Sequence, residues 1–156
     1  MESLHVVLPE AQLRQQTLAA AAELQAGAAQ FHAWEADRLV ALREKSGSDD
    51  LGSASLLWLR RSDEGFIRLV ARASGRKPSS AASAELAAFR RQANDELGRL
   101  LTEQLALEKR LGVLVEDAYG LTPEERQLLR DTRPIRDPID VLEDRLAGLG
   151  EENHGD

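Results

Sequence analysis

The chain has 156 residues, a formal net charge of −7 and no cysteine. The lack of cysteine in the sequence excludes disulfide bonds, thiol catalysis and metal sites built on thiolates. With three Phe, two Trp and one Tyr, the chain has few large side chains to fill a thick core. Composition therefore favours long helices that bury a narrow seam.

The negative charge is concentrated in the C-terminal part of the chain. Residues 1–115 hold 15 acidic and 15 basic side chains, whereas residues 116–156 hold 12 acidic and 5 basic ones. An acidic segment repels phosphate, so we expect no nucleic-acid contact there. No apolar run approaches the roughly 20 residues that cross a bilayer, and the first ten residues lack a basic leader. We therefore expect a cytoplasmic protein without a membrane partner.

The first predicted element is a long amphipathic helix over residues 8–45. Pro9 suits a first helical turn, and the Ser-, Gly- and Asp-rich stretch 46–50 predicts the end of the helix. The alanine-rich runs 19–22 and 26–29 keep the helix slim, so a partner can approach closely. One stripe recurs at alternating steps of four and three residues: Ala20, Leu24, Gly27, Phe31, Trp34 and Arg38.

Residues 46–78 form an arginine-rich connector, for which we predict short helices and keep a strand pair as the alternative. Ser62 is placed to cap a segment over residues 66–73, which ends at Gly75 and Pro78. Six basic side chains in this connector are candidate contacts to DNA phosphates: Arg60, Arg61, Arg68, Arg72, Arg76 and Lys77.

Three of these arginines are four residues apart, so one helix face presents them together, with Trp58 and Phe66 nearby. This arrangement is compatible with nucleic-acid binding. The interpretation that we favour is an ordinary solvated face opposite Phe66, Ile67 and Val70, because exposed arginines on helices are common.

Residues 79–120 carry the clearest pattern, that of a heptad coiled-coil helix. Arg90 and Gln104 interrupt the second seam position. Such polar residues cost stability but can fix register or partner; the alternative is a frayed helix start and a solvated gap. The pattern leaves open whether the seam binds a second copy or the first helix. The predicted helix-packing seam has one position filled every seven residues and a second filled by leucine or alanine: Leu86, Ala93, Leu100, Leu107 and Leu114, with Leu97, Leu111 and Ala118.

Residues 121–150 are predicted to form short capped helices. Gly120 ends the preceding helix, and Thr122, Pro123 and Glu125 occupy the N-cap, first and third positions of a capping box. Asp137 followed by proline repeats this device. Helices are therefore expected near 123–131 and 138–149, with a disordered tail over 151–156. The fold class is all-α: a long antiparallel helical hairpin or coiled coil with short C-terminal helices.

Sequence motifs of catalysis and cofactor binding are absent. The sequence has no Walker, nucleophile-elbow, zinc-protease or paired-cysteine pattern. His5 and His154 each follow a glutamate at helical ligand spacing, but both lie near the termini. His32 is interpreted as a surface or seam residue. We therefore expect no catalytic residue, no cofactor and no metal site, and hence no enzyme.

The segment from Val115 to Glu125 resembles the C-terminal region of large N6-adenine DNA methyltransferases of the Type IIG restriction-modification kind and of related phage-defence systems. In those proteins a long helix ends in a similar turn, followed by an acidic helix start. Residues 31–35 and 37–42 resemble helical segments of the same regions more loosely. The resemblance spans roughly residues 90–149. The turn that carries it consists of Tyr119, Gly120, Leu121 and Thr122.

The catalytic motifs of that family are missing from this sequence. The Asn-Pro-Pro-Tyr motif cannot occur, because Asn94 and Asn153 are the only asparagines and neither precedes proline. The Gly-rich S-adenosylmethionine loop is missing as well. The resemblance thus implies a non-catalytic helical accessory or spacer module, whose partner is a helix of a methyltransferase subunit and, through the arginines, duplex DNA. The alternative is a homodimerising coiled-coil scaffold unrelated to DNA.

Overall fold

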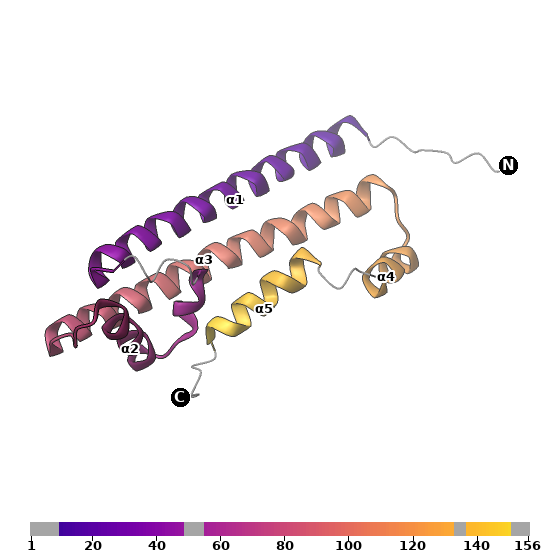
Figure 1. The fold of residues 1–156 in the computed structure, drawn as a ribbon. Coiled ribbons are helices and arrows are strands. Elements are labelled where there is room, and N and C mark those ends of the chain that lie inside the picture. The colour runs from indigo at the N-terminus through magenta and orange to yellow at the C-terminus, as the bar shows by residue number, and fades with distance from the viewer. Residues whose placement is uncertain (1–9, 49–54, 133–136, 151–156) are drawn as a thin grey trace.

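The computed structural model describes residues 10–48, 55–132 and 137–150, and every regular element in these ranges is a helix (Figure 1). The predicted all-α class is therefore confirmed, and residues 55–78 do not form the strand pair that was the alternative for the connector. The tail predicted to be disordered, 151–156, lies outside the described residues. The elements are α1 (Ala11–Ser46), the 3-10 helix η2 (Ser55–Arg60), α2 (Asp63–Ser74), α3 (Ser80–Ala118), α4 (Pro123–Asp131) and α5 (Pro138–Gly150).

The two long helices α1 and α3 run antiparallel and pack along their length (Figure 1). α1 ends where Gly47 adopts a left-handed φ of 64° and its N–H donates to the carbonyl of Arg43 at 2.8 Å. α3 is capped at its N-terminus by Ser79, whose side chain accepts from the N–H of Ala82. Of the two arrangements that the heptad pattern left open, the chain thus forms the hairpin.

Three of the six aromatic side chains, Trp58, Phe66 and Phe89, gather at one end of this hairpin. We call it the closed end: the C-terminal part of α1, η2, α2 and the start of α3. Trp58 stacks on Phe89 with ring centroids 5.6 Å apart and contacts Phe66 at 5.2 Å. Leu42 and Val70 are buried in the same cluster. The sequence suggested only a narrow seam, but these few aromatic residues are concentrated into a local core.

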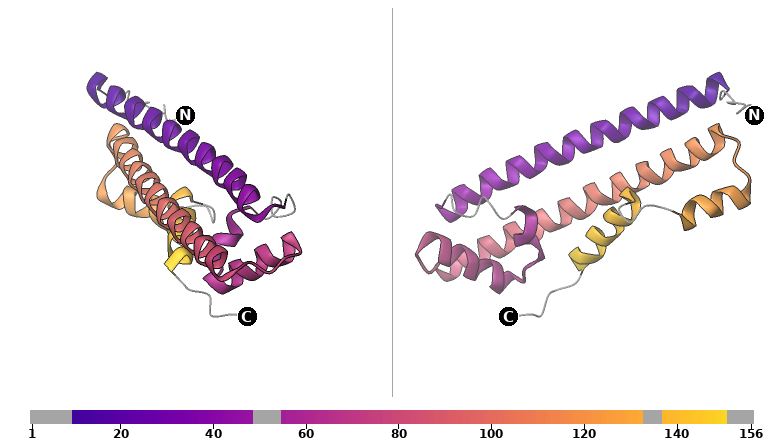
Figure 2. Two further views of the ribbon diagram at one scale, coloured as in Figure 1. Left: turned by 90° about the vertical axis from the view of Figure 1, so that its left-hand side faces the viewer. Right: turned by 45° about the vertical axis from the view of Figure 1, so that its right-hand side comes forward.

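α5 lies against α3 on the side opposite α1 (Figures 1 and 2). Leu142 is buried there, and Leu146 and Leu149 pack against the core. At the other end of the hairpin, the open end, α1 begins, α3 ends and α4 follows. None of the described residues of α4 is buried. No helix in the described ranges has both the length and the apolar character needed to cross a membrane.

Candidate functional site

The predicted helix-packing seam lies in the interior of the hairpin. Gly27 of α1 lies opposite this seam, since a Cβ at that position would be 3.7 Å from Leu107 and from Gln104. The second polar interruption, Gln104, therefore lies beside α1. Burial along the seam decreases toward the open end: Leu86, Ala93, Leu97 and Leu100 are buried, whereas Leu107, Leu111 and Leu114 are half-buried.

Arg90, the first polar interruption of the seam, connects three elements. Its side chain is buried, its Nε lies 2.7 Å from Asp63 Oδ1, and its Nη1 donates to the carbonyl of Leu59 at 3.3 Å. Arg90 therefore ties α3 to the start of α2 and to η2, and it is not part of a frayed helix start. The sequence contained no signal for this pair, because Asp63 is distant in the chain.

A second polar cluster joins α1 to α3 in the middle of the hairpin. Trp34 Nε1 donates to Glu96 Oε2 at 2.8 Å, and Arg38 Nη2 lies 2.6 Å from the same oxygen. Burial acts to raise the pKa of Glu96, but hydrogen bonds from Trp34 and Gln92 and the charge of Arg38 outweigh it, so the pKa lies below its usual value. This carboxylate holds the two helices in register.

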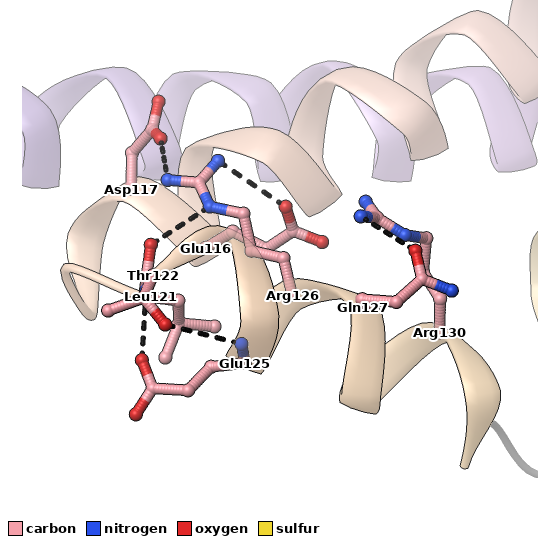
Figure 3. A network of polar contacts seen from close by, with 8 residues as sticks. All are labelled: Glu116, Asp117, Leu121, Thr122, Glu125, Arg126, Gln127 and Arg130. Atoms are coloured by element: carbon pink, nitrogen blue, oxygen red, sulfur yellow. Dashed lines mark hydrogen bonds and ion pairs between the residues drawn. The ribbon is translucent and has the colours of Figure 1, made fainter.

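The predicted structural turn at the open end is confirmed in detail (Figure 3). Gly120 has a left-handed φ of 62°. The Thr122 N–H donates to Glu125 Oε2 at 2.8 Å, and the Glu125 N–H donates to Thr122 Oγ1 at 3.3 Å, which closes the capping box.

Arg126 then fixes the first turn of α4 to the end of α3 (Figure 3). It donates to the carbonyl of Leu121 at 3.0 Å and to Asp117 Oδ1 at 2.8 Å, and it lies 3.5 Å from Glu116. The N-terminal turn of α4 is therefore held firmly, while the rest of the helix is exposed.

The end of α3 and the helix α4 carry most of the strongly exposed apolar side chains of the described residues. Six large apolar side chains of the described residues are more than half exposed, and four of them lie here. We call these four the distal apolar surface: Val113 (52 %), Tyr119 (66 %), Leu128 (63 %) and Leu129 (51 %). The sequence predicted a helix near 123–131, but it contained no sign that the leucines of α4 stay exposed.

A groove of about 300 Å³ adjoins the distal apolar surface between α3, α4 and α5. Val113 and Ile139 supply its apolar part, and Lys109 of α3 forms a 2.6 Å ion pair with Glu143 of α5 beside it. Nearby, burial and the charge of Asp137 raise the pKa of Glu108. Asp137 accepts the N–H of Ile139 at 2.9 Å, which confirms the predicted cap of α5.

The six basic residues of the connector are all exposed, and none of them forms an ion pair with a described residue. Arg68 and Arg72 lie on the outer face of α2, because Phe66 and Val70 are buried on its inner face. Arg60 lies close to α5, because the Nη2 atom of Arg60 would be 3.3 Å from a Cβ atom placed on Gly148. The remaining three are Arg61, Arg76 and Lys77. Arg76 lies beyond the end of α2 at Ser74, so the prediction that one helix face presents Arg68, Arg72 and Arg76 together is wrong.

The aromatic residues near these arginines are not available to a nucleic acid. Trp58 is 1 % exposed and Phe66 is 0 % exposed, since both belong to the core. The idea that they accompany the arginines at a nucleic-acid surface is therefore wrong. Arg68 and Arg72 are exposed opposite the buried Phe66 and Val70, as both the solvated-face and the phosphate-contact interpretations require.

Histidines and carboxylates do not form a metal centre in the described ranges. There, no three or more His, Asp or Glu side chains are grouped to hold an ion. His32 is exposed, with Nδ1 3.9 Å from Glu35. His5 and His154 lie outside the described residues.

Comparisons of the chain with protein-family models, with curated proteins and with solved structures found no significant match. The resemblance to DNA methyltransferases consequently stays a prediction from the turn at residues 119–122 and its flanking helices.

Proposed function

We propose that this chain is a non-catalytic helical accessory module of a DNA methyltransferase, restriction-modification or phage-defence system, and that it docks a protein partner at its open end. The observation that carries this proposal is the distal apolar surface. Soluble proteins rarely leave several large apolar side chains exposed in one region unless another surface covers them. This region also contains the segment that resembles the methyltransferases.

Charge complementarity indicates the kind of partner. The described residues between 113 and 150 include nine acidic side chains and three basic ones. Apolar side chains in an acidic part of the chain suit an amphipathic helix whose apolar face is flanked by Lys and Arg. We therefore propose a basic amphipathic helix of a methyltransferase or restriction subunit as the occupant of the open end.

The hairpin is suited to act as a spacer. The 39 residues of α3 give it a length of about 58 Å. α1 supports α3 through the Glu96 cluster in the middle and through a 2.8 Å ion pair between Glu23 and Arg110 in the open half. A partner bound at the open end is thereby held far from the closed end.

The alternative function, a homodimer formed through the heptad seam, is less well supported. Leu86, Ala93, Leu97 and Leu100 are already covered within the chain. A second copy could reach these residues only by displacing α1. The mass of the purified chain in solution tests this alternative. A dimer would favour the homodimeric scaffold over the accessory module if a charge substitution at Leu100 or Leu107 dissociates that dimer.

The experiment that tests the proposal is affinity co-purification of the tagged chain from its native host, with and without nuclease. The double variant Leu128→Glu/Leu129→Glu alters the distal apolar surface, and Val40→Glu is the control, because Val40 is 51 % exposed near the closed end. We expect the wild type and the control to retain a methyltransferase or restriction subunit that the double variant loses. Recovery of the chain alone, or equal recovery with all three proteins, would overturn the proposal.

A further inference from the structure

The outer surface of the closed end carries cations that the fold does not use. Arg61, Arg68, Arg72, Arg76 and Lys77 are exposed and form no ion pair with a described residue. The stretch 55–79 contains two carboxylates, Asp63 and Glu64. Asp63 is already paired with the buried Arg90 at 2.7 Å and with Arg91 of α3 at 3.7 Å, so it forms no ion pair with the five exposed cations. The stretch 55–79 is therefore positively charged on a chain whose net charge is negative.

Three of these cations follow one another along α2 and its C-terminal turn. Arg68 and Arg72 are one helical turn apart, roughly 5–6 Å. Arg76 follows directly after Gly75, which ends the helix with a φ of 65°. Because Phe66 and Val70 anchor the opposite face of α2 in the core, Arg68 and Arg72 are held on a rigid element, whereas Arg76 follows the end of the helix and lines a groove with Lys45 and Glu85.

We propose that this row binds the phosphate backbone of duplex DNA without reading its sequence. The choice of DNA as the polyanion rests on the proposed function, but the binding surface itself does not. The stretch 55–79 has no Asn or Gln to contact adenine edges, and its aromatic residues Trp58 and Phe66 are buried. Arginines presented in this way contact phosphate, which gives affinity and orientation but little sequence preference.

An anionic membrane fits this surface less well than DNA. A helix that lies on a membrane inserts large apolar side chains beside its cations. The exposed large apolar side chains of the described residues all lie outside 58–79. The acidic open end also disfavours any second contact with phosphate, so DNA would bind by the closed end alone. The hairpin would then hold the protein partner and the DNA at opposite ends.

The test is fluorescence anisotropy of a labelled duplex of about 24 base pairs with the purified full-length chain, between about 50 and 200 mM salt. The variant Arg68→Gln/Arg72→Gln/Arg76→Gln removes three charges from the row. The control Arg14→Gln/Arg99→Gln/Arg145→Gln removes three charges from exposed positions elsewhere. Circular dichroism of all three proteins verifies that the helices are intact.

We expect the wild type and the control to bind, with affinity that falls as salt rises, and the row variant to bind at least about tenfold more weakly at low salt. Its slope of log affinity against log salt should be smaller by about 2 to 3, because each phosphate contact contributes about 0.9. Equal affinity of the two variants, or no binding at low salt, would overturn the proposal.

Two further outcomes would also overturn the proposal. A preference of more than about tenfold for one duplex over a scrambled one would show that bases are read. A membrane would be identified as the ligand if the wild type binds no DNA but sediments with vesicles rich in phosphatidylserine, and if the row variant does not sediment with them. Because the assay contains no protein partner, its failure leaves the proposed docking at the open end untouched.

Discussion

The closed and open ends of the hairpin differ in both packing and charge. At the closed end, large side chains such as Leu42, Trp58 and Phe66 are almost completely buried, and the outer surface is basic. At the open end, Leu128 and Leu129 are exposed and the surroundings are acidic. The comparison indicates that the closed end supplies most of the stability, whereas the open end leaves apolar surface free for a partner.

The largest expected difference between the two ends comes from one substitution made at each. Leu42→Ala should lower the free energy of unfolding by about 2–5 kcal/mol, because Leu42 is 1 % exposed and its loss leaves a cavity. Leu128→Ala, at a side chain that is 63 % exposed, should change it by less than about 0.5 kcal/mol. Urea denaturation measures both. Losses of similar size would show that α4 contributes to the fold as much as the core does.

The buried arginine of the closed end gives the next largest effect. Asp63→Asn should cost about 2 kcal/mol, because it leaves Arg90 buried without its counter-charge while Asp63 itself is partly exposed. The matched control is Glu103→Gln, which removes the partner of Arg99 from an exposed pair on α3 and should cost a few tenths of a kcal/mol. If both variants unfold at the same urea concentration as the wild type, Arg90 does not hold α2 and η2 on α3.

Two glycines of the open half should respond with opposite signs. Gly27→Ala should stabilise the chain by about 0.5–1 kcal/mol, since a Cβ has ordinary contact distances of 3.7 Å there and alanine favours a helix interior. Gly120→Ala should destabilise it by about 1 kcal/mol, because Gly120 has a φ of 62°. Thermal unfolding separates the two variants. A gain in stability from Gly120→Ala would mean that the turn is not held in the conformation described.

Local signals in the sequence were sufficient for most helices and their caps, but the helix predicted over 66–73 begins three residues earlier, at Asp63. Ser62 and the capping box from Thr122 to Glu125 act as predicted, because caps depend on residues within one turn of the helix. The heptad pattern identified the side of α3 that contacts α1. It did not identify Leu101, which is buried outside the two seam positions. A heptad seam describes contact with one partner helix, whereas α3 also packs on α5 and therefore buries a wider face.

The parts that could not be predicted depend on tertiary contacts. The Arg90 and Asp63 pair, the Glu96 cluster and the stacking of Trp58 on Phe89 join residues that are distant in the chain. The distal apolar surface is a separate case. An amphipathic pattern predicts that one face of α4 is covered, but it does not state whether the same chain or a partner covers it.

The smallest expected effect is a dependence of stability on pH at two glutamates, one in the middle of the hairpin and one beside α5. The pKa of Glu96 is lowered from 4.5 in the folded chain. Glu96 therefore contributes stability that is present above its unfolded pKa and is lost as the pH falls through its folded pKa. The pKa of Glu108 is raised, so its contribution is present below the unfolded pKa and is lost as the pH rises through the folded pKa.

Urea denaturation between about pH 3 and about pH 7 can separate these two contributions. Glu96→Gln should lower stability at neutral pH and flatten its loss in acid, since the amide cannot supply the charge that Arg38 binds. Glu108→Gln should raise stability at neutral pH, because a neutral side chain avoids both burial of a charge and repulsion from Asp137. Parallel pH profiles of both variants and the wild type would mean that neither carboxylate differs from its unfolded state, and the Glu96 cluster would then not hold α1 to α3.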